Sequence, residues 1–236
     1  MIRNRKKRFV KRLVMTLLLS ITCLGYFKIY TYYSESAQAL STKSYYDTER
    51  TIEDLEKRTL IVVDAGHGDF DPGSDNEGYL EKDINLEIAL KLQAALEEAG
   101  YAVLMTRSDD TFLELYERSD FANEANADLF ISIHQNDYAQ DSSVNGIEVY
   151  YNSSKTTEDK KFAQMVQDAL IHETGANNRG IRVDNGLVVT RETTMPAILV
   201  ETAFISSEKE LPLITSDDYQ NKVVAGMIAG IKNFLG

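Results

Sequence analysis

Apolar residues recur at two different spacings from about residue 60 to the end of the chain. Short apolar runs rich in β-branched residues, which are typical of buried strands, alternate with longer stretches in which apolar residues return every three or four positions, as in amphipathic helices. The predicted strands are residues 60–64, 103–106, 129–133, 146–151, 187–190 and 197–201. The predicted helices are residues 82–99, 113–126, 158–174 and a last segment that begins after Ser216, a typical N-cap residue.

This alternation of strands and helices predicts an α/β fold: a single domain with a mostly parallel central sheet of about six strands, flanked by helices on both faces. Ligands of such sheets bind beyond the carboxyl ends of the strands. We therefore expect the chemistry of this protein to follow Asp64, Ile133 and Val200, where three predicted strands end.

A different pattern precedes the domain. Seven Lys and Arg residues lie within the first 12 positions, and an apolar run with a Tyr-rich extension follows at residues 13–33. Because a spanning helix needs about 20 apolar residues, we predict a basic cytoplasmic segment and transmembrane anchor at residues 1–33, a stalk at 34–58 and the α/β domain at 59–236. The alternative is a cleaved secretory signal, for which Ala37-Gln38-Ala39 offers a cleavage site. Both interpretations place the domain outside the cytoplasm, the first as a single-pass protein of the cell membrane.

The charge of the chain is concentrated in the domain. From residue 51 onward, 15 Lys and Arg stand against 34 Asp and Glu. Such an acidic domain should repel nucleic acid, so we expect no nucleic-acid partner. The only cysteine, Cys23, lies in the predicted anchor, which excludes a disulfide and a thiolate zinc site from the domain.

Two of the three histidines, His67 and His134, directly follow predicted buried strands. Glu81 begins the first long helix, and Glu201 ends the strand at 197–201. Two imidazoles and one carboxylate make a three-ligand zinc site that leaves a fourth position for water. Because a carboxylate in an apolar run is costly without a partner or a role, Glu201 is the candidate proton acceptor and donor. The alternative for each histidine is a core or capping role.

Short motifs across the domain carry a resemblance to a known family. They are Val63-Asp64-Ala65-Gly66-His67-Gly68, Asp71-Pro72-Gly73-Ser74, Glu81-Lys82-Asp83-Ile84-Asn85-Leu86, Thr106-Arg107, Ala127-Asp128-Leu129-Phe130-Ile131-Ser132-Ile133-His134, Gly146-Ile147-Glu148-Val149-Tyr150-Tyr151, Arg179-Gly180, Thr194-Met195-Pro196-Ala197 and Leu199-Val200-Glu201. In their order and spacing, residues 60–234 resemble the zinc-dependent N-acetylmuramoyl-L-alanine amidases, the Amidase_3 family of cell-wall hydrolases.

The resemblance implies one Zn²⁺ held by His67, Glu81 and His134, with Glu201 as the catalytic glutamate. It also suggests that Asn136 and Arg191 help to hold the substrate. The implied reaction is hydrolysis of the amide between N-acetylmuramic acid and L-alanine in peptidoglycan. Two alternatives stay open: a zinc peptidase acting on stem peptides, and a non-catalytic wall-binding scaffold. We expect a monomer with peptidoglycan and the membrane as partners, and the resemblance leaves room for an unidentified protein activator.

The chain departs from the family pattern at three positions, Ala65, Asp69 and Ala203, where Pro, Gly and Gly are usual, and none of these is a predicted ligand. Asp64 has two interpretations: it either orients a metal-bound imidazole or stabilises the turn that follows the strand. His172, on a predicted helix, is expected to be a surface residue.

Overall fold

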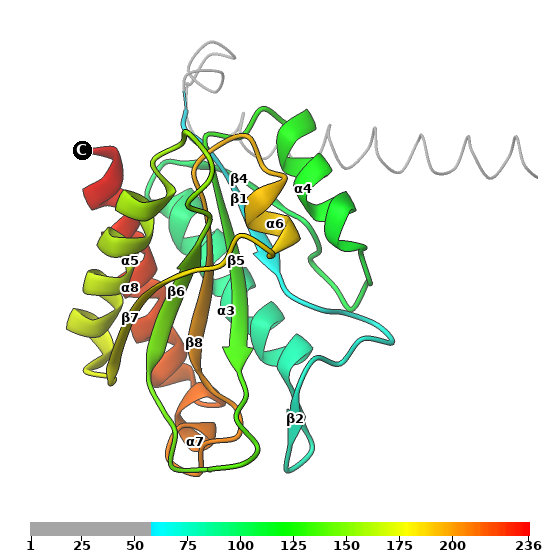
Figure 1. Cartoon of the computed structure of the whole chain (residues 1–236), viewed down its shortest axis with the longest axis vertical. Coiled ribbons are helices and arrows are strands. Elements are labelled where there is room, and N and C mark those ends of the chain that lie inside the picture. The colour runs from blue at the N-terminus through cyan, green and yellow to red at the C-terminus, as the bar shows by residue number, and fades with distance from the viewer. Residues whose placement is uncertain (1–57) are drawn as a thin grey trace, which may run out of the picture. The chain divides into compact units, whose positions relative to one another are not determined.

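A six-stranded sheet in the order β4-β1-β5-β8-β6-β7 forms the centre of the computed structural model, which describes residues 58–236 (Figure 1). The strands are β1 (Leu60–Ala65), β4 (Ala102–Met105), β5 (Leu129–Asn136), β6 (Ile147–Tyr151), β7 (Asn178–Val183) and β8 (Ala197–Phe204). A two-stranded hairpin of β2 (Asp75–Asn76) and β3 (Tyr79–Leu80) projects from the loop after β1. The helices are α3 (Glu81–Glu98), α4 (Leu115–Glu124), α5 (Asp159–Thr174), α6 (Val188–Arg191), α7 (Leu211–Ile214) and α8 (Asp217–Leu235).

The direction of the strands divides the sheet in two. β4, β1, β5 and β8 pair in parallel, and β6 and β7 pair in parallel with each other, but β6 runs antiparallel to β8. The predicted α/β fold with a mostly parallel six-stranded sheet is therefore confirmed for the described residues. The reversal at β6 sets Glu148 directly opposite Glu201, and this pairing shapes the site described below.

The two faces of the sheet are covered unequally. Ile61, Val63 and Ala65 of β1 point into a large core with α3, α5 and α8, whereas Val62 points to a small core that Ala122 of α4 and Val189 of α6 help to form. Strand residues alternate between faces because the side-chain period of a strand is two. On the face with the thinner cover, toward α4 and α6, Leu199 of β8 lines a cavity.

Two predictions for individual elements need correction. Residues 187–190 were predicted as a strand, but the structure forms the short helix α6 at Val188–Arg191. The sixth strand is instead β7, whose sequence NRGIRV is polar and exposed at both ends. Such a strand at the edge of a sheet lacks the apolar run that marks a buried strand. The predicted cap of the last helix is confirmed: the Ser216 side chain accepts a hydrogen bond from the Tyr219 backbone.

The predicted anchor at residues 1–33 and nearly all of the predicted stalk lie outside the described residues. Within residues 58–236, every helix is too short or too polar to cross a bilayer.

Candidate metal and catalytic site

Three predicted ligands converge from three elements. His67 lies in the loop after β1, Glu81 is the first residue of α3, and His134 lies near the end of β5. One ligand atom from each lies within 4.8 Å of the others, the only such group of His, Cys, Asp and Glu found among the described residues. The alternative that both histidines are ordinary core or capping residues does not explain this convergence.

The distances within this group suit a metal ion. Glu81 Oε1 lies 3.2 Å from His67 Nε2 and 2.9 Å from His134 Nδ1. Tetrahedral zinc, with bonds of about 2.0–2.1 Å to nitrogen and oxygen, would hold its ligand atoms about 3.3 Å apart. The donor set, two imidazoles and one carboxylate, is also the one that catalytic zinc sites use. The residues therefore fit a zinc ion.

Two glycines make this close approach possible. A Cβ atom at Gly66 would lie 2.2 Å from His134 Cε1, and one at Gly73 would lie 2.5 Å from Glu81 Oε2. Gly73 also has a φ of 65°, a conformation that side chains disfavour. These positions therefore need glycine for space, and Gly73 also for its backbone conformation.

Glu81 is 3% exposed and is held as a carboxylate. Burial alone would raise its pKa, but hydrogen bonds and charge interactions with His134 and His67 outweigh burial and lower the pKa. The backbone of Ser74 and Gln135 and the side chain of Asn85 donate further hydrogen bonds to the carboxylate. At His67, burial would lower the pKa, but Glu81 and Asp71 outweigh it and raise the pKa. Both shifts have one cause: the carboxylates and the imidazoles lie close enough together to stabilise each other's charged forms.

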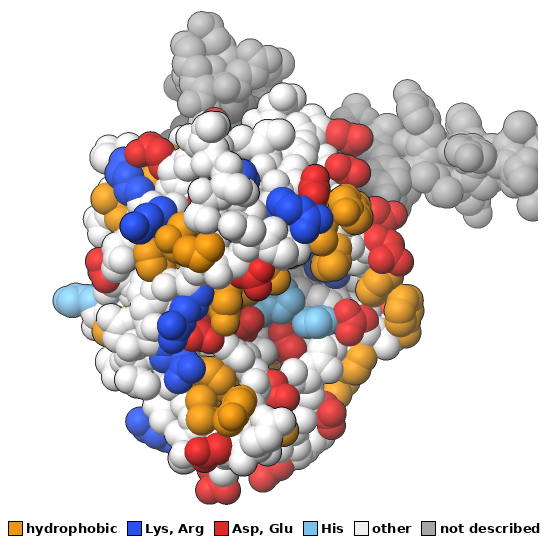
Figure 2. Space-filling view, in the orientation of Figure 1, with side chains coloured by type: hydrophobic (Ala, Val, Ile, Leu, Met, Phe, Trp, Pro, Cys, Tyr) orange, Lys and Arg blue, Asp and Glu red, His pale blue; other side chains and the backbone are white. Residues whose placement is uncertain are grey.

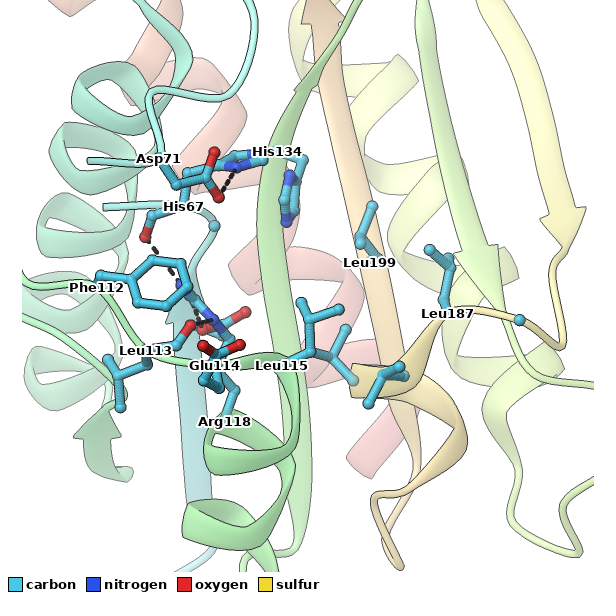
Figure 3. A pocket seen from close by; sticks show the side chains of 15 residues that line it. His67, Asp71, Phe112, Leu113, Glu114, Leu115, Arg118, His134, Leu187 and Leu199 are labelled. Carbon is cyan, nitrogen blue, oxygen red and sulfur yellow. Dashed lines mark hydrogen bonds and ion pairs between the residues drawn. The ribbon is translucent and has the colours of Figure 1, made fainter. Parts of the chain in front are cut away.

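His67 is oriented by Asp71, which begins one of the family motifs but has no role predicted from the sequence. His67 Nδ1 lies 2.7 Å from Asp71 Oδ2 (Figure 3). This contact leaves Nε2 of His67 facing Glu81, with the His134 ring beside it. Carboxylates commonly fix metal-binding imidazoles in this way. The i, i+4 spacing of His67 and Asp71 across the glycine-rich turn was the available signal, but it could not show that the turn folds back.

The backbone at His67 has a φ of 64°, and two buried arginines hold this segment. Arg118 donates hydrogen bonds to the carbonyl oxygens of Ala65 and His67, and Arg107 donates to those of Ala65 and Gly66. A non-glycine residue in this conformation is strained. The two arginines therefore fix the position of the ligand loop.

Asp64 has the second of its two predicted roles. Its carboxylate accepts hydrogen bonds from Thr106, Ser132 and Arg118 and none from an imidazole of the described residues. Asp64 thus positions Arg118, which in turn positions the turn that carries His67.

Glu201 stands beside the metal ligands on β8, opposite His134 of β5 in the parallel ladder. Its Oε2 atom is buried and has no hydrogen-bond partner among the described residues. Burial, and then the charges of Glu81 and Glu148, raise the pKa of Glu201 well above its ordinary value. A carboxyl group with a raised pKa can both accept and return a proton near neutral pH.

On its other side, Glu201 is flanked by Glu148 of β6. Unlike Glu201, Glu148 is fully engaged: Asn136 and the Tyr150 hydroxyl donate to its Oε1, and Arg179 and Arg182 donate to its Oε2. Asn136, a predicted substrate residue, therefore lies at the site and is fixed by this acid. Glu148 belongs to one of the family motifs, but the sequence predicts no role for it, because its pairing with Glu201 depends on the antiparallel register.

A cavity of about 460 Å³ opens on one side of the two histidines. Its walls are mainly apolar and come from the loop before α4, from the start of α6 and from Leu199 of β8 (Figure 3). Figure 2 shows the histidine side chains in this hollow, with acidic side chains around them.

The predicted substrate residue Arg191 is not part of the wall of this cavity. It binds Glu192, the Gly186 carbonyl oxygen and the Tyr116 hydroxyl, so it supports the loop before α6. His172 is 84% exposed, as expected for a surface residue.

An α/β domain with three residues that could hold a metal ion, and with a separate carboxyl group beside them whose Oε2 is unpaired among the described residues, has the architecture expected of a metal-dependent hydrolase. The comparisons with known proteins narrow this class. Residues 61–233 match the family model Amidase_3, described as N-acetylmuramoyl-L-alanine amidase. The chain belongs to this family.

The similar proteins agree with the family assignment. N-acetylmuramoyl-L-alanine amidase LytC of Bacillus subtilis (strain 168) is 37% identical over 176 residues, which cover 74% of this chain but 35% of LytC. The crystal structure of N-acetylmuramoyl-L-alanine amidase from Clostridium difficile 630 is 35% identical, with a TM-score of 0.73 over 75% of this chain and 97% of that one. The CwlD amidase from Clostridioides difficile, solved in complex with the GerS lipoprotein, is 32% identical, with a TM-score of 0.72 over 75% of this chain and 98% of that one.

Proposed function

We propose that this chain is a zinc-dependent N-acetylmuramoyl-L-alanine amidase that acts on peptidoglycan during cell-wall remodelling. It hydrolyses the amide between the lactyl group of N-acetylmuramic acid and the L-alanine that begins the stem peptide. The observation that carries the proposal is the juxtaposition of His67, Glu81 and His134 with the unpaired Oε2 atom of Glu201. Family membership supplies the substrate class.

The described residues divide the work between binding and proton transfer. Zinc held by the three ligands would supply a Lewis acid for the scissile carbonyl and would activate water. Glu201 accepts the proton of the attacking water and passes it to the nitrogen of L-alanine as the carbon–nitrogen bond breaks. The products are a lactyl carboxyl group and a free amino terminus. The Oε2 atom of Glu201 has no hydrogen-bond partner among residues 58–236, so this atom is not engaged in another interaction.

Purified peptidoglycan digested with the full chain tests this function. We expect new amino-terminal alanine, without new reducing sugar and without new amino termini within the stem peptide. Termini within the stem peptide would instead support the zinc peptidase. A chain that binds peptidoglycan and releases nothing would support the non-catalytic scaffold.

Glu201→Gln is the matched control for the digestion. The variant keeps the shape of the side chain but cannot accept a proton, so it should lose alanine release by at least about a hundredfold while its zinc content stays near that of the parent. Unchanged release would remove Glu201 from the mechanism. Chelation of the parent should abolish release and added zinc should restore it.

For its location, we propose a single-pass membrane protein with residues 59–236 outside the cytoplasm, on the basis of the basic and apolar pattern of residues 1–33. The tether would keep a monomeric enzyme near its polymer. We expect to recover the intact chain in the membrane fraction, with the domain accessible to protease from outside. A shortened chain in the medium would favour the cleaved signal.

The complex of CwlD with a lipoprotein supports a search for a protein activator.

A further inference from the structure

Two arginines of β7 stand out in a domain dominated by acids. Arg179 and Arg182 both reach Glu148, and no second arginine or lysine pair of the described residues shares one buried carboxylate in this way. Glu148 is 4% exposed and lies one strand from Glu201. Two cations therefore bind one buried anion directly beside Glu201, the proposed site of proton transfer.

The geometry of the pair leaves most of its hydrogen-bonding capacity unused. Each arginine binds Glu148 Oε2 through Nε alone, at 3.1 Å for Arg179 and 3.2 Å for Arg182. Their Nη atoms donate no hydrogen bond to any of the residues 58–236. Arg179 is further fixed by the Phe204 ring, whose centroid lies 4.8 Å from its guanidinium carbon. Arginine binds carboxylates best through two parallel N–H groups. The N–H groups of the two Nη atoms remain available for this in both arginines.

Arg179 and Arg182 lie on the polar side of the site. A cavity of about 420 Å³ on this side is lined by Asn136, Asp137, Tyr138, Val144, Glu148, Arg179 and Phe204. The cavity on the other side of the histidines has mainly apolar walls. A substrate that crosses the site therefore meets mainly apolar walls on one flank and hydrogen-bonding and charged groups, Arg179 among them, on the other.

The two ends of the proposed substrate also differ in polarity, as the two sides of the site do. The glycan end is uncharged near the scissile amide and has apolar sugar faces. The peptide end continues from L-alanine to a D-glutamyl residue, which carries a free α-carboxylate or its amide. Arg179 and Arg182 carry the positive charge that would complement a carboxylate at the peptide end.

We propose that Arg179 and Arg182, held in place by Glu148, bind the α-carboxylate of the residue that follows L-alanine in the stem peptide. The inference rests on the proposed amidase function and adds a specificity to it: the enzyme prefers stem peptides with D-glutamate over those with the amide, D-isoglutamine. Glu148 is a positioning residue that presents the two guanidinium groups.

The test compares two uncrosslinked glycan strands whose stem peptides differ only in this carboxylate or carboxamide. A hydrogen-bonded ion pair is worth enough for about tenfold or more in kcat/KM, so the parent should cleave the acidic strand about tenfold better. Arg182→Gln should lower kcat/KM for the acidic strand by about tenfold, mainly through KM, and should change that for the amidated strand by less than about threefold. Arg182→Lys, which keeps the charge without the planar fork, should restore part of the preference.

Lys160→Gln is the matched control, because it removes one positive charge from an exposed position of α5, and it should keep the parent's preference. An equal loss on both strands in Arg182→Gln would show that the arginines only support Glu148 and would overturn the proposal. A parent that cleaves both strands equally well would also overturn it while leaving the amidase function intact. A parent that cleaves neither strand would contradict the amidase function itself, and the inference would fall with it.

Discussion

Replacing Asp71 with Asn tests how much the orientation of His67 contributes to metal binding. Asp71 Oδ2 accepts the hydrogen bond of His67 Nδ1 at 2.7 Å, and Oδ1 accepts that of the Gly73 backbone at 3.1 Å. Asn keeps one acceptor oxygen for the turn but loses the negative charge that stabilises the ligand. The turn should therefore persist while the imidazole becomes a weaker and less well oriented donor.

The structure also sets the expected size of the effect. Loss of such a partner typically costs about 10–100-fold in metal affinity. The Asp71 side chain is 38% exposed, so solvent screens its charge, and we expect the lower end of that range, about tenfold or ~1.4 kcal/mol. The zinc dissociation constant of the full chain, measured by competition with a chromophoric chelator, gives this value directly.

Asp75→Asn is the appropriate control, because it removes an exposed carboxylate from the same loop without touching an imidazole. A dissociation constant for Asp71→Asn equal to that of this control would refute the reasoning. Activity at saturating zinc should recover most of the parent's rate in Asp71→Asn, because Glu201 is untouched.

Two further predictions concern the scaffold of the site. Asp64→Asn should lower the free energy of unfolding by about 3–5 kcal/mol in a denaturant titration, because it leaves the buried Arg118 without its counter-ion. Burial would raise the pKa of Asp64, but Arg118 and the hydrogen bonds outweigh burial and lower the pKa below the ordinary 3.8. The parent should therefore lose this stabilisation as the pH falls below about 4. Asp64→Asn should lack that part of the dependence of stability on pH. Gly66→Ala should lose zinc with little change in far-ultraviolet circular dichroism, since its Cβ would displace the His134 ring; zinc binding at the parent's affinity would contradict this steric argument.

Much of the fold follows from periodicity, because the strands β1, β5 and β8 are buried apolar runs and α3, α5 and α8 each present one apolar stripe. The two errors have one cause. The edge strand β7 is polar, and the start of α6 is apolar and β-branched because Leu187 and Val189 face the thin core. Burial at these two places depends on the tertiary structure and not on local propensity.

The sequence pointed to the four residues of the candidate site because His67 and His134 follow apolar runs, Glu81 begins a long helix and Glu201 ends an apolar run; the structure brings His67, Glu81 and His134 together. The residues that hold these side chains in place could not be predicted from the sequence. Asp71 and Arg118 act through a turn whose backbone conformation no pattern shows, and Glu148 acts through a register between antiparallel strands that are 53 residues apart at Glu148 and Glu201. Side chains that hold other side chains depend on three-dimensional contacts alone.

The unequal covering of the sheet has a consequence for how the molecule opens. The core under α3, α5 and α8 contains 29 buried apolar residues, whereas the one under α4 and α6 contains eight. Local opening costs less free energy where fewer apolar contacts are lost. Amide hydrogens of α6 should therefore exchange through local fluctuations, while those of β1 and β5 exchange only on global unfolding. Because the start of α6 forms part of the wall of the apolar cavity, we expect the cleft to widen on this side while the strands that carry His134 and Glu201 stay closed.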